Sequence, residues 1–207
     1  MPRIHLVRHG HVHNPDKVLY GRLENFRLSD AGREMAEAVA RRFAADGVPV
    51  GRVVASPLQR AQETAAPIAA AFGLSVDTDE RLIEAWNLWE GSPLQSGPKD
   101  FIHPRNWWRL RNPWRPSWGE PYKEQAERMW AAIRDAAAAT PDKDTVLVSH
   151  QLPIWVARCV FERRSLLHDP RSRECALASV TAFDVDADGT ATAVHYSTPA
   201  AHVEVPR

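Results

Sequence analysis

The amino-acid sequence predicts an α/β protein with three α/β/α layers, in which helices cover both faces of a mainly parallel sheet. Short apolar runs rich in Val, Ile and Leu alternate with longer segments whose apolar residues recur at helical spacing. Such alternation is typical of parallel strands joined by helical crossovers. We expect one domain over residues 1–207, with an insertion at about 86–120 that shows little periodicity.

The first strand is predicted at Ile4–Val7, a β-rich apolar run that ends at an Arg-His-Gly triplet. A helix then begins near Ser29, which can cap it, and ends before Gly47. Between these ends, apolar residues follow a helical period opposite several charged ones. A second buried strand is expected at Arg52–Ala55.

Ser56 comes directly after this strand and starts a capping-box pattern, with Pro57 at the first helical position and Gln59 two residues later. The pattern predicts a helix that Ser56 caps and that runs to about Phe72. A short strand is expected next, at Ser75–Asp77.

The second half of the chain continues the alternation. A long helix is predicted at Tyr122–Ala139, a buried strand at Thr145–Val148 and a further helix at about Pro153–Glu162. Two more strand candidates, Ser179–Val185 and Ala191–Tyr196, are separated by a polar turn. We find no internal repeat and no low-complexity linker.

The composition argues against several classes of protein. Lys+Arg and Asp+Glu each total 26, whereas a dedicated nucleic-acid binder usually carries a basic excess. No uncharged stretch is long enough to span a bilayer, and Met1–Arg3 leads straight into a strand without the apolar region of a signal peptide. The two cysteines, Cys159 and Cys175, imply no disulfide framework. We expect a cytoplasmic protein without nucleic-acid or membrane partners, and we assign it no metal or cofactor.

Charged side chains gather at one edge of the predicted sheet. Arg8 and His9 follow the first strand, Arg60 follows the second, and His150 follows the strand at 145–148. Ligands bind beyond the carboxyl ends of parallel strands, so these side chains should converge. Two guanidinium groups match a tetrahedral oxyanion such as phosphate, and the adjacent helix N-termini add backbone N–H groups.

This set of residues predicts phosphoryl transfer through a histidine. A His between two Arg side chains is disfavoured as a cation, so His9 should stay neutral and nucleophilic. His150 could donate to the phosphoryl oxygens as charge develops in the transition state. Glu84, beyond the third strand and beside the insertion, is the best-placed general acid for the leaving alkoxide.

Four sets of residues in this order are similar to the motifs of a known family. They are Leu6–Gly10, Ser56–Ala65, Arg81–Glu84 with Trp89–Gly91, and Val148–His150. On these segments the chain resembles the histidine phosphatase superfamily, which has the fold of cofactor-dependent phosphoglycerate mutase.

The resemblance implies a role for each matching residue. His9 resembles the phosphorylated nucleophile. Arg8, Arg60 and His150 resemble the rest of the phosphate pocket. Glu84 resembles the proton donor and, for the water step, the base. The implied activity is hydrolysis of a small-molecule phosphate monoester.

The chain also departs from the family pattern. Where mutase-type members have Glu-Thr after the Gly, this chain has His11 and Val12, and Asn14 stands one place early. Gln151 follows His150, where Gly is common in the family. Asn14 and Gln151 are further candidates for phosphate binding. The loss of the acidic residue and the hydroxyl favours a phosphatase over a phosphoglycerate mutase-type phosphotransferase.

Three alternatives stay open at this point. The first is the phosphotransferase itself, and the second is a non-catalytic protein that binds a phosphorylated ligand. The third is a metal-dependent hydrolase, because His9, His11 and His13 alternate like strand-end zinc ligands. Against the third, Arg8 would repel a cation.

The insertion sets the limit of the sequence prediction. Its first part, residues 86–118, holds six of the eight Trp, and residues 99–118 carry a local charge of +4. We expect this Trp- and Arg-rich segment to form a lid that shapes the pocket. An anionic sugar phosphate, a carboxylate phosphate and a ring-bearing phosphate all fit it. A homodimer could form through the strand-rich edge or this segment, and no sequence feature requires one.

Overall fold

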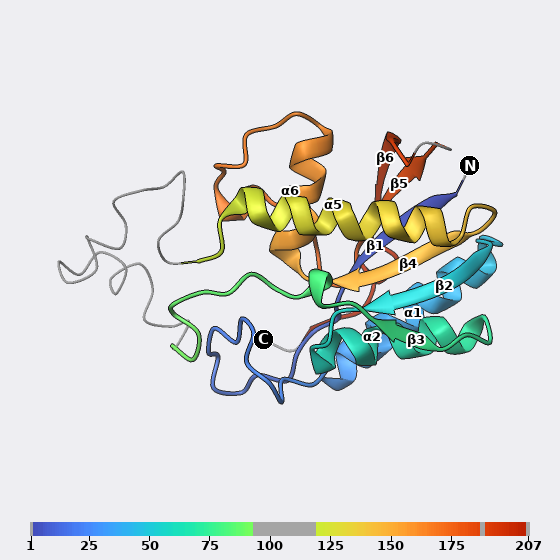
Figure 1. Cartoon of the computed structure of the whole chain (residues 1–207). Coiled ribbons are helices and arrows are strands. Elements are labelled where there is room, and N and C mark those ends of the chain that lie inside the picture. Colours follow the sequence, from blue (N-terminus) through green and yellow to red (C-terminus); the bar gives the residue numbers. More distant parts are fainter. Residues whose placement is uncertain (1, 93–118, 187–188, 206–207) are drawn as a thin grey trace.

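The computed structural model of the chain describes residues 2–92, 119–186 and 189–205, and Figure 1 shows its elements. In chain order these are β1 (Arg3–Arg8), α1 (Asp30–Ala45), β2 (Val50–Ala55), α2 (Gln59–Ala71), β3 (Val76–Thr78), η1 (Glu80–Leu82), α5 (Tyr122–Ala139), β4 (Asp144–Ser149), α6 (Gln151–Phe161), η4 (Pro170–Ser172), β5 (Val180–Val185) and β6 (Ala191–Ser197). Each predicted strand and helix is present, with ends that differ by at most a few residues.

The six strands form one sheet in the order β3-β2-β4-β1-β5-β6. The strands β3, β2, β4 and β1 are parallel, whereas β5 is antiparallel to β1 and β6 is antiparallel to β5. The predicted mainly parallel sheet is therefore confirmed, with an antiparallel hairpin at one edge. Because the four parallel strands share one direction, their carboxyl ends meet at the same edge (Figure 1).

Two pairs of helices cover the sheet, α1 with α2 on one face and α5 with α6 on the other (Figure 1). Side chains of β1 point alternately to the two faces of the sheet, so this strand packs against both helix layers. Val7 packs in the cluster that contains α1 and α2, and Ile4 and Leu6 pack in the cluster that contains α5 and α6. Burial on both faces explains why the central strands are apolar throughout.

The predicted caps of the first two helices have different outcomes. Ser29 is confirmed as the N-cap of α1, where its Oγ accepts a backbone N–H of the first turn at 3.1 Å. The capping box of α2 is wrong, since the helix begins at Gln59 and Leu58 stands at the N-cap without a side-chain bond. The Ser56 hydroxyl instead lies 2.8 Å from Nε2 of His150. The hydroxyl also accepts the Leu58 N–H at 3.4 Å, so it links the loop before α2 to the distant end of β4.

The segment predicted as a lid, about 86–120, is described only at its two ends, because residues 93–118 lie outside the described residues. Those ends meet. Asn87 and Gly119 form an isolated antiparallel bridge, and the Glu120 N–H donates to the Trp86 carbonyl oxygen at 3.2 Å. Residues 86–87 and 119–120 therefore lie side by side.

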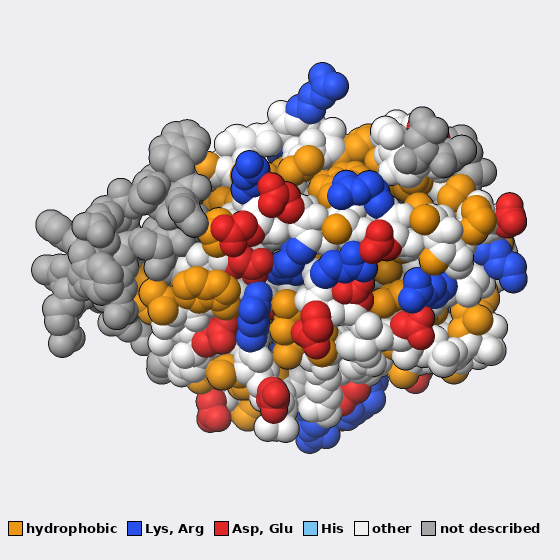
Figure 2. Space-filling model, in the orientation of Figure 1, with side chains coloured by type: hydrophobic (Ala, Val, Ile, Leu, Met, Phe, Trp, Pro, Cys, Tyr) orange, Lys and Arg blue, Asp and Glu red, His pale blue; other side chains and the backbone are white. Residues whose placement is uncertain are grey.

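Charged side chains of both signs are interspersed on the face shown in Figure 2. Many of them form local ion pairs. Arg81, for example, contacts both Asp79 and Asp135 at 2.6 Å. In the part of the chain that the structure describes, no helix is long and apolar enough to cross a membrane.

Candidate active site

The candidate site lies at the carboxyl-end edge of the parallel strands, where the loops after β1, β2 and β4 meet (Figure 1). Arg8 ends β1, and the N–H of the next residue, His9, donates to the Ser149 carbonyl oxygen of β4 at 3.1 Å. Gly10 then brings the loop against α1, since a Cβ on Gly10 would lie 2.5 Å from the Gly32 carbonyl oxygen. A glycine at this position therefore keeps the His9 backbone close to the sheet.

His9 is 2% exposed, and its Nδ1 lies 2.8 Å from the Gly10 carbonyl oxygen. Burial, and then the charges of Arg60 and Arg8, hold the pKa of His9 well below its ordinary value, so the ring is neutral. A carbonyl oxygen can only accept, so Nδ1 carries the single proton and Nε2 keeps a lone pair. The backbone thus fixes His9 in the tautomer that a nucleophile at Nε2 requires.

The ring of His150 lies beside that of His9, with 5.2 Å between the centroids, and it is fully buried. Burial, and then the charge of Arg60, lower the pKa of His150 well below its ordinary value. The Ser56 Oγ accepts the Leu58 N–H at 3.4 Å and lies 2.8 Å from Nε2 of His150. A hydroxyl oxygen has two lone pairs, so Oγ can accept from Leu58 and either donate to Nε2 or accept from it; when Oγ donates, the His150 proton lies on Nδ1. In that arrangement both histidines carry their proton on Nδ1.

Arg8 and Arg60 supply the positive charge of the cluster. Arg60, in the first turn of α2, is 1% exposed, donates to the Gly21 carbonyl oxygen at 2.5 Å and lies over the Tyr20 ring at 4.8 Å. Arg8 donates to the Cys175 carbonyl oxygen at 2.6 Å. Within residues 2–92, 119–186 and 189–205, neither guanidinium forms an ion pair with a carboxylate.

Three buried nitrogen atoms in this cluster have no hydrogen-bond partner among the described residues. They are Nε of Arg8, Nε of Arg60 and Nδ1 of His150. The two guanidinium nitrogens carry hydrogen, as does Nδ1 of His150 when Ser56 donates to Nε2, and a buried donor without an acceptor costs free energy. Convergent donors beside two uncompensated charges fit an anion with several acceptor oxygens, such as phosphate.

Glu84 completes the set of residues predicted from the sequence. Its Oε1 accepts the Ala85 N–H at 2.9 Å. Burial raises the pKa of Glu84, while the charges of Arg60 and Arg8 oppose that rise. A carboxyl group with a raised pKa can keep a proton closer to neutral pH, as a general acid must. Since the same two guanidinium charges act on Glu84 and on His9, the structure brings these predicted residues into one cluster.

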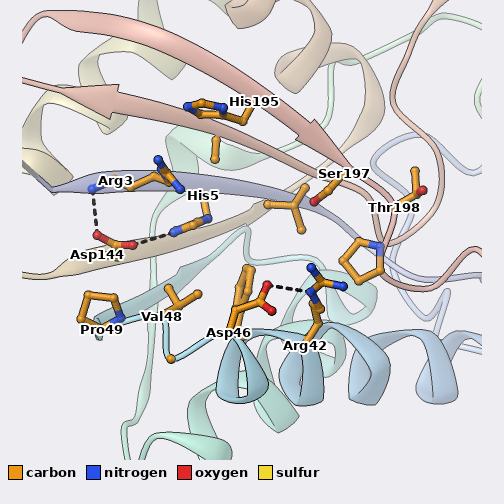
Figure 3. Close-up of a pocket in the computed structure, with 15 residues that line it drawn as sticks. Arg3, His5, Arg42, Asp46, Val48, Pro49, Asp144, His195, Ser197 and Thr198 are labelled. Carbon is orange, nitrogen blue, oxygen red and sulfur yellow. Dashed lines mark hydrogen bonds and ion pairs between the residues drawn. The ribbon is translucent and has the colours of Figure 1, made fainter.

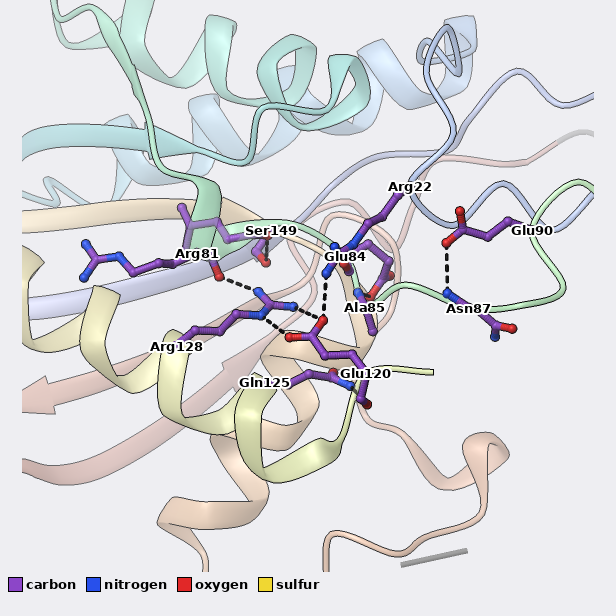
Figure 4. Close-up of polar contacts among 11 residues, drawn as sticks. Arg22, Arg81, Glu84, Ala85, Asn87, Glu90, Glu120, Gln125, Arg128 and Ser149 are labelled. Carbon is purple, nitrogen blue, oxygen red and sulfur yellow. Dashed lines mark hydrogen bonds and ion pairs between the residues drawn. The ribbon is translucent and has the colours of Figure 1, made fainter. Parts of the chain in front are cut away.

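Figure 4 shows the contacts that hold the segment bearing Glu84. Arg22 donates to the Glu84 carbonyl oxygen at 2.6 Å and to the Glu120 carboxylate at 2.7 Å. Arg128, on α5, donates to the same carboxylate at 2.7 Å and to the Arg81 carbonyl oxygen. Sequence reasoning missed this network, since Arg22 and Glu120 stand 98 positions apart and no local pattern links them.

The two less specific predicted residues, Asn14 and Gln151, differ in their surroundings. Asn14 closes its own loop, because its Nδ2 donates to the Val18 carbonyl oxygen at 2.8 Å and its Oδ1 accepts the Val18 N–H at 3.1 Å. Gln151 begins α6, and its Nε2 lies 3.5 Å from the Cys175 carbonyl oxygen that also accepts from Arg8. Gln151 therefore borders the cluster, whereas the Asn14 amide is used mainly to shape the loop.

The residues at the mutase-type Glu-Thr positions fasten the loop to α1. The Nδ1 of His11 lies 2.8 Å from Oγ of Ser29, the N-cap of α1, and Val12 is buried and bridges to Leu28. Over the described ranges, no group of three or more His, Cys, Asp and Glu side chains is arranged to hold a metal ion.

A cavity of about 470 Å³ lies at the opposite, amino-end edge of the same strands (Figure 3). Its lining also contains Arg and His side chains, but each of them contacts a carboxylate. The pairs are His5–Asp144 at 2.9 Å, Arg42–Asp46 at 2.6 Å, Arg3–Asp184 at 2.5 Å and His195–Asp184 at 2.8 Å.

The fold and this arrangement of residues agree with the comparison to known families. Residues 4–198 match the sequence model of the histidine phosphatase superfamily (branch 1). The chain therefore belongs to the histidine phosphatase superfamily. Its sheet and helices are those of the phosphoglycerate mutase-like phosphatases in that superfamily.

Relatives place the chain within this family. It is 51% identical over 199 residues to "Uncharacterized protein Rv0525" of Mycobacterium tuberculosis, covering 96% of this chain and 97% of that one. It is 30% identical to "Probable phosphoglycerate mutase GpmB" of Yersinia enterocolitica, over 87% of this chain and 85% of that one. The mycobacterial glucosyl-3-phosphoglycerate phosphatase Rv2419c is similar in structure, with a TM-score of 0.76, 25% identity, and coverage of 96% and 98% of the two chains. The complex of that phosphatase with inorganic phosphate matches with a TM-score of 0.73 and 25% identity, over 95% of this chain and 96% of that one.

Proposed function

We propose that this protein is a phosphatase that hydrolyses a small-molecule phosphate monoester through a phosphohistidine intermediate on His9. The observation that carries this proposal is the neutral His9, held with its lone pair on Nε2 near two guanidinium groups that have no carboxylate partner among the described residues. The mycobacterial relative solved with inorganic phosphate supports a phosphate ligand for the shared fold.

In the first step, Nε2 of His9 attacks the phosphorus atom and the P–O bond to the alcohol breaks. Arg8, Arg60 and the Nδ1–H of His150 donate to the phosphoryl oxygens, which carry more charge in the transition state. Glu84 gives its proton to the leaving oxygen, so the alcohol departs neutral.

In the second step, a water molecule attacks the phosphohistidine from the side that the alcohol has left. Glu84, now a carboxylate, takes a proton from this water, the P–Nε2 bond breaks, and inorganic phosphate leaves. Glu84 is then protonated and His9 is again neutral, so each residue returns to its starting state. The raised pKa of Glu84 suits it to both transfers.

Trapping of the intermediate tests this proposal. The wild-type protein, mixed with a radiolabelled phosphate ester and quenched, should carry acid-labile and base-stable label, and His9→Ala should carry none. Hydrolysis without any such label would contradict the phosphohistidine scheme. A wild-type protein that binds phosphate yet turns over no ester would favour the non-catalytic alternative.

A phosphotransferase of the mutase type is the second candidate, because of the similarity to GpmB. Such an enzyme would pass the phosphoryl group to a second acceptor and would depend on a bisphosphate primer. The hydrolase that we propose should do neither. Measurement of inorganic phosphate release with and without a primer separates the two activities.

A further inference from the structure

A third arginine, Arg173, lies beside the candidate site on the loop that follows α6. Hydrogen bonds fix this loop against the phosphate cluster. The Cys175 N–H donates to the Arg173 carbonyl oxygen at 2.9 Å, and the Cys175 carbonyl oxygen accepts from Arg8 at 2.6 Å. Further along, the Ala178 N–H donates to the His9 carbonyl oxygen at 3.3 Å. The loop that carries Arg173 is thus tied to both residues of the Arg-His pair.

Within the described part of the chain, the side chain of Arg173 is held by one hydrogen bond, which leaves its terminal nitrogens available. Its Nε donates to Nε2 of His168 at 2.8 Å. The Nδ1 of His168 in turn donates to the Leu166 carbonyl oxygen at 2.7 Å, and the ring lies between Tyr122 and Trp155 with 5.8 Å to each centroid. His168 is therefore fixed as a neutral acceptor that orients the guanidinium of Arg173.

The charge of Arg173 is not compensated locally. Among the described residues it has no carboxylate within ion-pair distance, in contrast to Arg22 and Arg128, which share Glu120. The guanidinium is half-buried, and its charge acts on Glu84, whose pKa it lowers together with Arg60 and Arg8. Together with the loop bonds to Arg8 and His9, this places an uncompensated cation next to the phosphate cluster.

We propose that Arg173, oriented by His168, is a specificity residue that binds a second anionic group on the leaving-alcohol part of the substrate. This inference rests on the proposed phosphatase function and adds the class of ester, one with a carboxylate or a second phosphate near the ester oxygen. A guanidinium whose Nε is already engaged presents its two terminal nitrogens as a fork, which matches either group. Arg8 and Arg60 hold the transferred phosphoryl group, so Arg173 is the cation that remains for the second charge.

Three propyl phosphates that differ only at the far end of the chain test the assignment, with a hydroxyl, a carboxylate or a second phosphate. The wild type should prefer an anionic ester over the hydroxyl ester in kcat/KM by about 10- to 100-fold, and Arg173→Gln should remove that preference. The readout is the ratio of kcat/KM between an anionic ester and the hydroxyl ester within each protein, because an effect of Arg173 on Glu84 is shared by both esters and cancels in that ratio. Arg171→Gln, an exposed arginine two positions away, is the matched control and should keep the preference. The better of the two anionic esters identifies the second group.

Binding of the corresponding phosphonates, which cannot be hydrolysed, separates this inference from the proposed function. A wild-type protein that hydrolyses no ester, yet binds an anionic phosphonate more tightly than Arg173→Gln does, would reject the phosphatase and keep the anion site. Hydrolysis with an unchanged preference in Arg173→Gln would overturn the role of Arg173. His168→Gln should lose part of the preference, and an unchanged preference there would reject the orienting role of His168.

Discussion

At the amino-end edge of the sheet, the side chains of Arg3 and His5 each contact a carboxylate, at 2.5 and 2.9 Å. Arg8, five residues after Arg3, and His9, four residues after His5, hydrogen-bond to carbonyl oxygens, and neither pairs with a carboxylate in the described ranges. Other elements add a second Arg and a second His at each edge, so the two edges hold the same types of side chain. They differ in their carboxylates. The amino-end cavity shown in Figure 3 holds charges that cancel, whereas the carboxyl-end cluster keeps its positive charge.

This difference shows that Arg and His alone do not make an anion site. A buried cation with a carboxylate partner is stabilised by that partner and gains little from a ligand. A buried cation without one is destabilised until an anion binds. Loops after β1, β2 and β4 therefore build a site by bringing donors together and leaving out the acids, apart from Glu84.

The largest expected effect concerns the two histidines that β1 supplies. His9→Gln should reduce kcat by about 10⁴-fold or more, because the nucleophile is lost. The matched change at the other edge, His5→Gln, should leave kcat unchanged and lower the free energy of unfolding by about 1–3 kcal/mol, since buried Asp144 loses the His5 contact at Oδ2 and keeps the Arg3 N–H at Oδ1. Steady-state kinetics and denaturant unfolding of both variants test these two expectations. Loss of activity in His5→Gln would contradict the assignment of catalysis to the carboxyl-end edge alone.

The second expected effect concerns one helix arginine at each edge, Arg60 on α2 and Arg42 on α1. Arg60→Gln should reduce kcat/KM by about 100-fold, since a donor to the phosphoryl oxygens is lost. The variant should unfold at the same or a higher temperature than the wild type, because Arg60 is a buried cation without a carboxylate partner. Arg42→Gln, which breaks the exposed pair with Asp46, should change neither quantity by much. A clear drop in the melting temperature of Arg60→Gln would argue that this cation is stabilised in the unliganded protein.

Glu84 gives the third effect, which depends on the leaving group. Glu84→Gln should slow hydrolysis of an alkyl phosphate by about 100-fold and hydrolysis of nitrophenyl phosphate less, because a good leaving group needs little protonation. In the wild type, alkyl ester hydrolysis should fall as the pH rises through the raised pKa of Glu84, since the donor loses its proton. This limb of the pH profile should vanish in the variant. Equal slowing for both esters would contradict a role in leaving-group protonation.

The smallest expected effect is on the way the free energy of unfolding depends on pH. The pKa values of His9 and His150 are lowered in the folded protein, so the unfolded chain binds more protons below the ordinary His pKa of about 6.5. Their contribution to stability is complete above that pH and is lost as the pH falls below it. The wild type should therefore lose stability between about pH 7 and pH 5 more steeply than a His9→Gln, His150→Gln double variant. Parallel curves from urea unfolding at several pH values would count against the neutral state of both rings.

Much of the site could be predicted because its residues stand at fixed offsets from strand ends. Arg8, His9 and His150 come at or directly after apolar runs, and a parallel sheet brings such ends together. The parts that failed or were missed depend on contacts between distant segments. Ser56 has a local capping pattern, yet its hydroxyl is used by His150, 94 positions away. Arg173 is one of many arginines in the sequence, and only the loop bonds to Arg8 and His9 distinguish it.

The central claim, that uncompensated cations at the carboxyl-end edge bind a tetrahedral anion, can be tested by one calorimetric titration of inorganic phosphate. The wild type and Arg42→Gln should each bind one phosphate per chain with similar affinity, whereas Arg60→Gln should bind it at least about 100-fold more weakly. Equal binding by Arg60→Gln, or loss of binding in Arg42→Gln, would contradict the account.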